Sequence, residues 1–234
     1  MKISVAVFAS GGGTNFQALL DRQSPDCAGR IVLLISDRPE IGALERAEKA
    51  GLDTRVIPVK GRSLDEVGEE TLAVLEEFEV RVILLAGYLR LIPPAVVRAF
   101  PRRILNIHPA LLPAFGGKGM WGHHVHEAVL ASGATFSGPT IHFVDEEYDT
   151  GSILAQWPVP VLAGDTPDSL AARVLSVEHI LYPLAADHLF RAVTAGRSAE
   201  RLSPPGAGVS VMSDFSAEAT AKQIEAAFKP CLES

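Results

Sequence analysis

The sequence predicts an α/β protein with a doubly wound, mostly parallel sheet and an antiparallel part toward its C-terminal end. Three observations lead to this prediction. Short apolar runs rich in Val, Ile and Leu recur through the first half, as expected of parallel strands buried on both faces. Amphipathic segments separate these runs, which is the rhythm of βαβ units. In the second half, two apolar runs are joined by a glycine-containing turn, which is typical of an antiparallel pair.

The first half of the chain alternates strands and helices. The fourth strand ends at Pro109, which has no N–H to continue a ladder. This order predicts a Rossmann-like sheet that binds its ligands outside the carboxyl ends of the strands. The expected strands are residues 3–8, 31–35, 80–86 and 103–107, and the expected helices are 15–21, 43–49 and 64–78.

The second half of the chain changes to a hairpin and a long helix. Asp165 or Thr166 suits the N-cap of the long helix, and Pro167 suits its first turn. The expected elements are a helix at 124–131, strands at 137–144 and 153–161 around a turn at 145–151, a helix from 167 to about 190, a loop at 203–214 and a terminal helix at 217–228.

Composition narrows the class of protein. Of 234 residues, 47% are hydrophobic, and the formal net charge of −7 gives no general attraction to nucleic acid. No run reaches the ~18 apolar residues of a membrane span, and the N-terminus enters a strand pattern without a cleavable signal. Cys27 and Cys231 fit free thiols. We expect a cytoplasmic protein that binds neither nucleic acid nor membrane; its oligomeric state stays open, with a homodimer among the options.

A glycine-rich segment, residues 10–15, joins the first strand to the first helix. Glycines allow a sharp turn, and the helix N-terminus presents unpaired N–H groups, so Gly13, Thr14 and Asn15 form a candidate phosphate site. The segment lacks the lysine of a triphosphate loop and the G-x-G-x-x-G spacing of dinucleotide sites. The alternative is a tight turn that only packs helix on strand.

Polar residues at the end of a buried strand indicate a reaction centre. Asn106 and His108 lie two residues apart and therefore on the same face of the strand, at the expected ligand crevice. Asp149, after His142, lies in the later turn, and a carboxylate near His108 would favour the imidazolium. The alternatives are a core histidine and a turn-forming aspartate. Asp149-Thr150-Gly151 also matches the tripeptide of aspartic proteases, but the second carboxylate and an all-β pattern are missing.

Three histidines, His123, His124 and His126, raise the question of a metal. They lack the i, i+4 helical spacing of a zinc pair, and no nearby cysteine completes a ligand set. We therefore expect no metal.

Several separated segments, taken together, resemble the phosphoribosylglycinamide formyltransferases, the folate-dependent formyltransferases of purine synthesis. The resemblance runs from residue 3 to about 188 and implies a formyltransferase-type catalytic domain over 1–202, with a tail over 203–234 that holds a short helix. The matching segments are 9–15 (ASGGGTN), 85–90 (LAGYLR), 106–113 (NIHPALLP), 142–145 (HFVD) with 149–151 (DTG), and 172–174 (ARV) with 178–179 (EH).

The resemblance implies a reaction and residue roles. The formyl group of 10-formyltetrahydrofolate, the co-substrate, would move to the amine of 5'-phosphoribosylglycinamide. Asn106, His108 and Asp149 would be catalytic, with Asn106 and a protonated His108 donating to the oxyanion. Gly13, Thr14 and Asn15 would hold the substrate phosphate and Glu178 its ribose. The folate pocket would be lined by Leu89, Arg90, Leu91, Ile92, Asn106, Val144 and Asp149.

The sequence also departs from the family pattern. An arginine that touches the folate in the family is replaced by Leu64, with Arg62 as a nearby candidate. The loop that contains Lys118, Met120 and Trp121 is longer than in many members, and we expect residues 110–122, with their four glycines, to act as a lid.

Three other functions remain as alternatives. A formyltetrahydrofolate hydrolase would share the catalytic set but carry an N-terminal regulatory domain, whereas the first strand here begins at residue 3. A tRNA formyltransferase would carry a further nucleic-acid-binding domain, whereas residues 203–234 are short and not basic. A non-catalytic nucleotide-binding module would leave Asn106, His108 and Asp149 unexplained.

Overall fold

A computed structural model describes residues 2–202 and 217–232. Its centre is a seven-stranded sheet in the order β3-β2-β1-β4-β5-β7-β8. The first five strands in this order are mutually parallel, whereas β7 runs antiparallel to β5 and β8 antiparallel to β7. The strands are β1 (Ile3–Ala9), β2 (Gly29–Ser36), β3 (Asp53–Val56), β4 (Val80–Leu85), β5 (Ile104–His108), β7 (Thr140–Phe143) and β8 (Ile153–Gln156).

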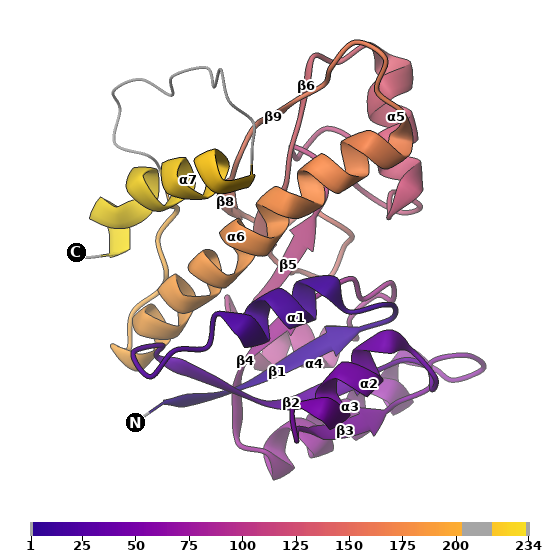
Figure 1. The fold of residues 1–234 in the computed structure, drawn as a ribbon. Coiled ribbons are helices and arrows are strands. Elements are labelled where there is room, and N and C mark those ends of the chain that lie inside the picture. The colour runs from indigo at the N-terminus through magenta and orange to yellow at the C-terminus, as the bar shows by residue number, and fades with distance from the viewer. Residues whose placement is uncertain (1, 203–216, 233–234) are drawn as a thin grey trace.

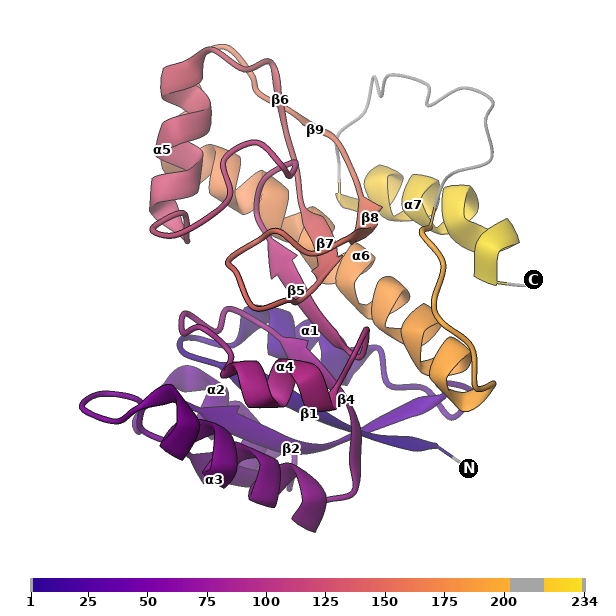
Figure 2. The ribbon, with the colours of Figure 1, turned by 180° about the vertical axis from the view of Figure 1, so that it is seen from behind.

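Helices cover both faces of the sheet (Figures 1 and 2). Alternation along β1 sends Val5 and Val7 into a core shared with α1, α2 and α6, and Ala6 and Phe8 into a second core shared with α3 and α4. The helices are α1 (Thr14–Asp21), α2 (Gly42–Lys49), α3 (Leu64–Glu77), α4 (Pro94–Ala99), α5 (His123–Ser132), α6 (Pro167–Thr194) and α7 (Ala217–Leu232).

The predicted fold class is confirmed, because four of the parallel strands lie where the apolar runs predicted them and the last two strands of the sheet are antiparallel. Two short elements, β3 and α4, were not predicted. The strand β3 is four residues long and none of them is buried, so it has no apolar run to reveal it.

The two long strands predicted in the second half are wrong in their extent. Each is divided in two, which creates a separate ribbon of β6 (Phe136–Ser137) and β9 (Val159–Pro160). The breaks occur at Pro139 and Pro158, which have no N–H for a ladder. Gly138 has a φ of 139°, and a Cβ there would collide with the Trp157 carbonyl, so the chain bends where the two segments touch.

Helix α6 is the long helix that the sequence predicted. Thr166 is its N-cap and accepts a hydrogen bond from the Ser169 N–H, with Pro167 in the first turn. The side chain of Asp165 receives two hydrogen bonds from Arg173, at 2.7 and 2.8 Å, which fix the start of the helix. The helix therefore carries Glu178, one of the predicted site residues, at a fixed place beside the sheet.

Helix α7 confirms the predicted terminal helix and extends it to Leu232. It packs on α6 (Figure 1), and its Ile224 and Phe228 are fully buried in the main core. The Phe228 ring meets Trp157 edge-on, with centroids 5.9 Å apart. The tail thus adds a packed helix to the domain, whereas the loop predicted at 203–214 lies outside the described residues. Among the helices described, none is both long and apolar enough to cross a membrane.

Candidate active site

A cleft of about 730 Å³ lies at the carboxyl ends of the parallel strands. The strand order reverses direction between β1 and β4, and the loops that follow these two strands diverge there to leave a crevice. The volume is in the range of sites for drug-sized ligands. Of the predicted site residues, those that line the cleft are Asn15, Leu89, Arg90, Leu91, Ile92, Asn106, His108, Val144, Asp149 and Glu178.

His108 and Asp149 meet at one end of the cleft. Nδ1 of His108 is 3.6 Å from Oδ2 of Asp149, and Nε2 of His108 is 2.8 Å from the Phe115 carbonyl. The His108 side chain is buried, with 4% of its surface exposed. Burial lowers the pKa of His108, and this outweighs the raising effect of Asp149 and the Phe115 carbonyl. Asp149 therefore raises the pKa of His108 as expected, but burial has the larger effect, and the net pKa in the free protein lies below the ordinary value.

Asp149 remains an anion in this buried position. Burial alone would raise its pKa, but the nearby His142 ring, the Gly117 N–H at 2.9 Å and the nearby His108 ring together lower the pKa below its usual value. The backbone of Asp149 has a φ of 58°, a strained conformation for a residue other than glycine. The fold holds this carboxylate in place at a conformational cost, as is common at functional sites.

His142 is a site residue whose contact with the reaction centre the sequence did not predict. It pairs with Asn106 across β5 and β7, and its Nε2 lies 3.1 Å from Nδ2 of Asn106 and 3.5 Å from Oδ1 of Asp149. Its Nδ1 lies 2.9 Å from the Phe143 carbonyl, so Nδ1 carries the hydrogen and Nε2 accepts from the Asn106 amide. His142 thereby orients Asn106. The sequence signals were its place in an apolar run and in the family-matching segment 142–145, but its pairing with Asn106 across the strands is not visible in the sequence.

The predicted lid, residues 110–122, closes over this end of the cleft. Phe115 contacts His108 and Gly117 contacts Asp149, so the loop touches both groups directly. Its beginning is anchored, because the Leu112 N–H donates to the buried Thr140 hydroxyl at 3.0 Å. Trp121, near the end of the loop, lines the cleft with 49% of its surface exposed.

The other end of the cleft contains Asn15 and Glu178. Nδ2 of Asn15 donates to Oε2 of Glu178 at 2.6 Å, while Oδ1 of Asn15 is buried without a partner. Glu178 is 6% exposed, and burial raises its pKa to about 7.

Gly13 is the N-cap of α1, with a φ of 73°, and no side chain caps the first turn. A Cβ at Gly13 would approach Ala43 to 2.8 Å, so the position requires glycine. Gly13 and Thr14 do not line the cleft themselves, but they adjoin Asn15, and the free N–H groups of this turn suit an anion.

The loop after β4, residues 86–93, forms one wall of the cleft. Arg90 donates through Nε to Asp37 at 2.8 Å, and its side chain remains 46% exposed. Neither Arg62 nor Leu64 reaches the cleft: Arg62 pairs with Glu70 at 2.6 Å, and Leu64 opens α3. Among the arginines of the described residues, Arg90 is therefore the one that lines the cleft.

The three histidines considered for a metal are not brought together as ligands. His123 lies 3.4 Å from Asp168, His124 lies 3.3 Å from Glu127, and His126 is buried with its Nδ1 unpartnered. Within residues 2–202 and 217–232, no group of three or more His, Cys, Asp or Glu side chains is arranged to hold a metal ion.

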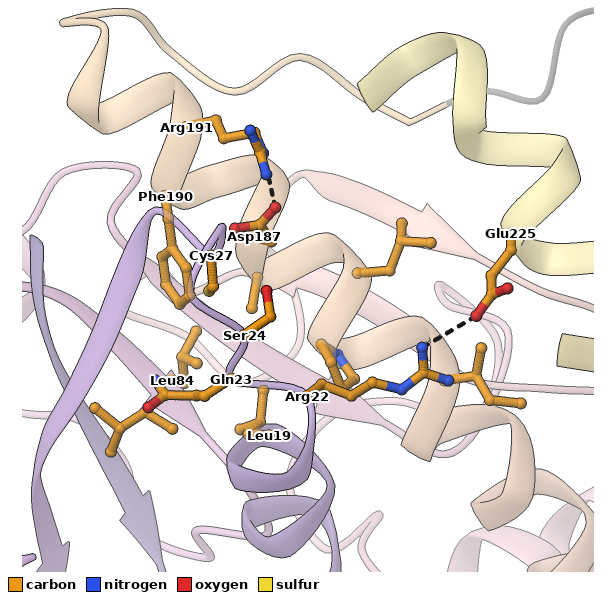
Figure 3. Close-up of a pocket in the computed structure, with 15 residues that line it drawn as sticks. Leu19, Arg22, Gln23, Ser24, Cys27, Leu84, Asp187, Phe190, Arg191 and Glu225 are labelled. Atoms are coloured by element: carbon orange, nitrogen blue, oxygen red, sulfur yellow. Dashed lines mark hydrogen bonds and ion pairs between the residues drawn. The ribbon is translucent and has the colours of Figure 1, made fainter. Parts of the chain in front are cut away.

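A second cavity, of about 210 Å³, lies behind the sheet between α1, α6 and α7. Figure 3 shows it bordered by Cys27, Asp187 and Phe190, with ion pairs from Arg191 to Asp187 and from Arg22 to Glu225. None of the predicted site residues lines it. The site is therefore the larger cleft.

Comparison with known proteins assigns the fold and cleft to a family. The family model for formyl transferase matches residues 3–186, which include all the elements that build the cleft. The chain belongs to the formyl transferase family.

Individual formyl transferases are similar over most of the chain. The chloroplastic phosphoribosylglycinamide formyltransferase of Arabidopsis thaliana is 54% identical over 76% of this chain and 62% of that protein. A phosphoribosylglycinamide formyltransferase structure from Brucella melitensis is 43% identical with a TM-score of 0.75, over 81% of this chain and 96% of that one. A formyltetrahydrofolate deformylase from Pseudomonas syringae, at 23% identity and a TM-score of 0.73 over 82% of this chain and 62% of that one, shares the fold.

Two features qualify these similarities. The chain spans 62% of the length of the Arabidopsis formyl transferase and 58% of that of the Vigna unguiculata protein. Helix α7 lies after residue 186, where the family match ends. The family model therefore describes the cleft and the sheet, and α7 is an addition that packs against the far end of α6.

Proposed function

We propose that this formyl transferase moves the formyl group of 10-formyltetrahydrofolate onto the amine of 5'-phosphoribosylglycinamide. The observation that carries the proposal is the convergence of Asn106, His108 and Asp149 at one end of the cleft, opposite Asn15 and Glu178 at the other. A donor that enters between the 86–93 loop and Val144 would bring its formyl group to the first end. A phosphorylated amine held at the second end would bring its nitrogen to that carbon. The names of the relatives at 54% and 43% identity support the choice of substrates.

In the proposed reaction the substrate amine attacks the formyl carbon, and its oxygen becomes an oxyanion. Asn106 donates an amide hydrogen to it, in the orientation that His142 sets. His108 donates the Nε2 hydrogen that the Phe115 carbonyl accepts in the free protein. The ring turns this hydrogen from the Phe115 carbonyl to the oxyanion, whose negative charge makes it the stronger acceptor. Donors of this kind each contribute about 10²–10³ to turnover.

The remaining step transfers a proton between the two nitrogens. The attacking amine becomes positively charged and must lose a proton, while the folate nitrogen that leaves must gain one. Asp149, ionised by its surroundings, accepts through a water the proton that the amine loses and returns it to the leaving nitrogen. The enzyme ends unchanged, and the products are the N-formylated amine and tetrahydrofolate.

The proposed partners are small molecules. The formyl folate is a co-substrate that leaves as product, and we propose that the reaction needs no metal. The cytoplasm remains our proposed location, although relatives of this chain are named as chloroplastic. We propose neither nucleic acid nor membrane as a partner, and a homodimer remains an option.

A formyl-transfer assay with and without the amine tests the proposal. Release of tetrahydrofolate that requires 5'-phosphoribosylglycinamide, with formate below the amount of formylated amine, is the expected result. Release of formate at the same rate without the amine would assign the chain to hydrolysis, which shares this fold with the deformylase. Transfer to the amine of a charged tRNA instead would assign it to tRNA formylation.

A further inference from the structure

A buried carboxylate lies beside the cleft without lining it. Asp37 follows β2 directly, and 2% of its side chain is exposed. Its Oδ2 accepts from Arg90 Nε at 2.8 Å and from Arg38 Nη2 at 3.2 Å. Burial would raise the pKa of Asp37, but hydrogen bonds from Ser10, Arg90 and Arg38 outweigh this and lower it. Asp37 is therefore an ionised group held by three partners from three segments of the chain.

Two of these partners connect Asp37 to the cleft wall. Arg90 belongs to the 86–93 loop itself, and its side chain lines the cleft. Ser10, the first residue of the glycine-rich segment, is 5% exposed; its hydroxyl accepts from the Leu89 N–H at 3.0 Å, and the interaction with Ser10 lowers the pKa of Asp37. The Ser10 N–H donates to the Gly87 carbonyl at 3.1 Å. Asp37 thus holds the loop directly through Arg90, while Ser10, which interacts with Asp37, holds the loop at Gly87 and Leu89.

The rest of the loop is packed unevenly. Gly87, its second residue, has a φ of 73°, in the left-handed region, and Leu89 is 37% exposed, whereas Ile92 is 2% exposed. Tyr88, which also lines the cleft, packs edge-on against Phe8, with centroids 5.4 Å apart. A backbone wall of this kind can shift by a fraction of an ångström, and misplacement on that scale weakens a bound ligand strongly.

We propose that Asp37 is a positioning residue that sets the 86–93 loop, and with it the guanidinium of Arg90, for the folate-bearing substrate. The inference rests on the proposed function for the identity of that substrate. Asp37 contacts no substrate in this arrangement; it acts through Ser10 and Arg90. Removing it should weaken the formyl-donor side of the cleft and leave the phosphate side, at Asn15 and Glu178, intact.

A purely structural role would give a different result. Loss of any buried, paired carboxylate leaves arginine without its partner and destabilises the fold. Asp165 supplies a matched control, because its side chain is 4% exposed and is bonded to Arg173, remote from the 86–93 loop. Arg38 supplies a second control, because it contacts the same oxygen as Arg90 but lies outside the loop and the cleft.

The experiment compares the full-length wild type with Asp37→Ala, Asp37→Asn, Asp165→Ala and Arg38→Gln. For each protein we would measure kcat, the KM for 10-formyltetrahydrofolate, the KM for the amine, and the melting temperature. We expect Asp37→Ala to raise the donor KM about tenfold or more, with the amine KM within about twofold. Asp37→Asn should restore part of the donor KM, because its amide oxygen still accepts from Arg90. Both controls should keep the donor KM of the wild type, whatever their melting temperatures.

Three results would overturn the inference. The first is a folded Asp37→Ala protein with an unchanged donor KM. The second is an equal rise of both KM values. The third is a rise of the donor KM in Asp165→Ala that matches the one in Asp37→Ala. If Asp37→Ala does not fold, Asp37→Asn and Ser10→Ala decide, and an unchanged donor KM in both contradicts the inference. Absence of formyl transfer in the wild type would instead refute the proposed function, and is seen before any variant is compared.

Discussion

Asp149 and Glu178 are both buried carboxylic acids that line the same cleft, yet their surroundings shift their pKa values in opposite directions. Asp149 has an imidazole on each side and a backbone N–H directed at it, and its pKa is lowered. Glu178 has one hydrogen bond, from Asn15, and burial raises its pKa to about 7. The nearby imidazoles account for the difference, since burial acts on both groups in the same direction: Asp149 has two such rings and a backbone N–H around it, whereas Glu178 has one amide donor.

The comparison separates the two ends of the cleft by task. At the Asp149 end the charges are already arranged in the free protein, as preorganised catalysis requires. At the Glu178 end a carboxyl group and the unpartnered Oδ1 of Asn15 lack donors that a ligand with hydroxyl groups would supply. We infer that the Asp149 end serves the reaction and the Glu178 end serves recognition. Each prediction below tests this division.

The largest effect is expected at the reaction end. Asp149→Asn removes the charge and keeps the shape, so turnover should fall about 10²–10³-fold while the affinity for the phosphorylated amine stays nearly constant. His108→Asn should behave similarly, and the double variant should lose far less than the product of the two effects. Steady-state kinetics and amine binding by calorimetry provide the measurements. Near-normal turnover of Asp149→Asn would show that another group moves the proton.

The second effect concerns stability and pH at the recognition end. Burial raises the pKa of Glu178 to about 7 in the folded protein, against an ordinary value of 4.5. Because the folded pKa is raised, the folded state binds the proton more tightly, and stability is lost as pH rises from about 4.5 through about 7. The loss amounts to about 3 kcal/mol. Urea unfolding at pH 5 and pH 8 should show it in the wild type and not in Glu178→Gln; equal pH dependence in both proteins would contradict the assignment.

The third expected effect is a change in the KM for the amine alone. Glu178→Gln keeps a hydrogen-bond acceptor but removes the charge available on ionisation, so the KM for the amine should rise about tenfold. The turnover number and the KM for the formyl donor should change little, because the Asp149 end is untouched. The same kinetic assay measures all three constants. A fall in turnover comparable to that of Asp149→Asn would remove the proposed division between the two ends.

The smallest effect tests the lid. Residues 110–122 contact His108 and Asp149 through Phe115 and Gly117, and the described contacts include none from this loop to Glu178. Binding of a formyl-donor analogue should therefore change the fluorescence of Trp121, whereas the amine alone should change it little. Trp157, the other tryptophan, is buried beside α7, so Trp157→Phe isolates the Trp121 signal. An equal response to both ligands would mean that the loop senses the whole cleft.

Local patterns in the sequence predicted much of the sheet and part of the candidate site, whereas Glu178 and the folate-pocket residues came from the family resemblance. Four parallel strands followed from apolar runs, and the glycine-rich segment from its composition. The placement of Asn106 and His108 on the same face of a strand end followed from the alternation of side chains along a strand. The division of two predicted strands at Gly138–Pro139 and at Pro158 was missed. Apolar residues on both sides of each proline resemble one continuous strand, although proline has no N–H for the ladder.

The sequence by itself therefore determined which residue types stand at the ends of the strands, and through them the fold class and the identity of Asn106, His108 and Asp149 as candidates. The tertiary structure alone decided which other residues these candidates contact and in which direction their pKa values shift. His142 joined the site by cross-strand pairing, and Asp37 met Arg90 from another part of the chain. The pKa of His108 shifted downward, against the expectation from its carboxylate neighbour. The pKa of a buried group depends on how far the surrounding segments exclude water from it. This desolvation is set only when those segments have packed together.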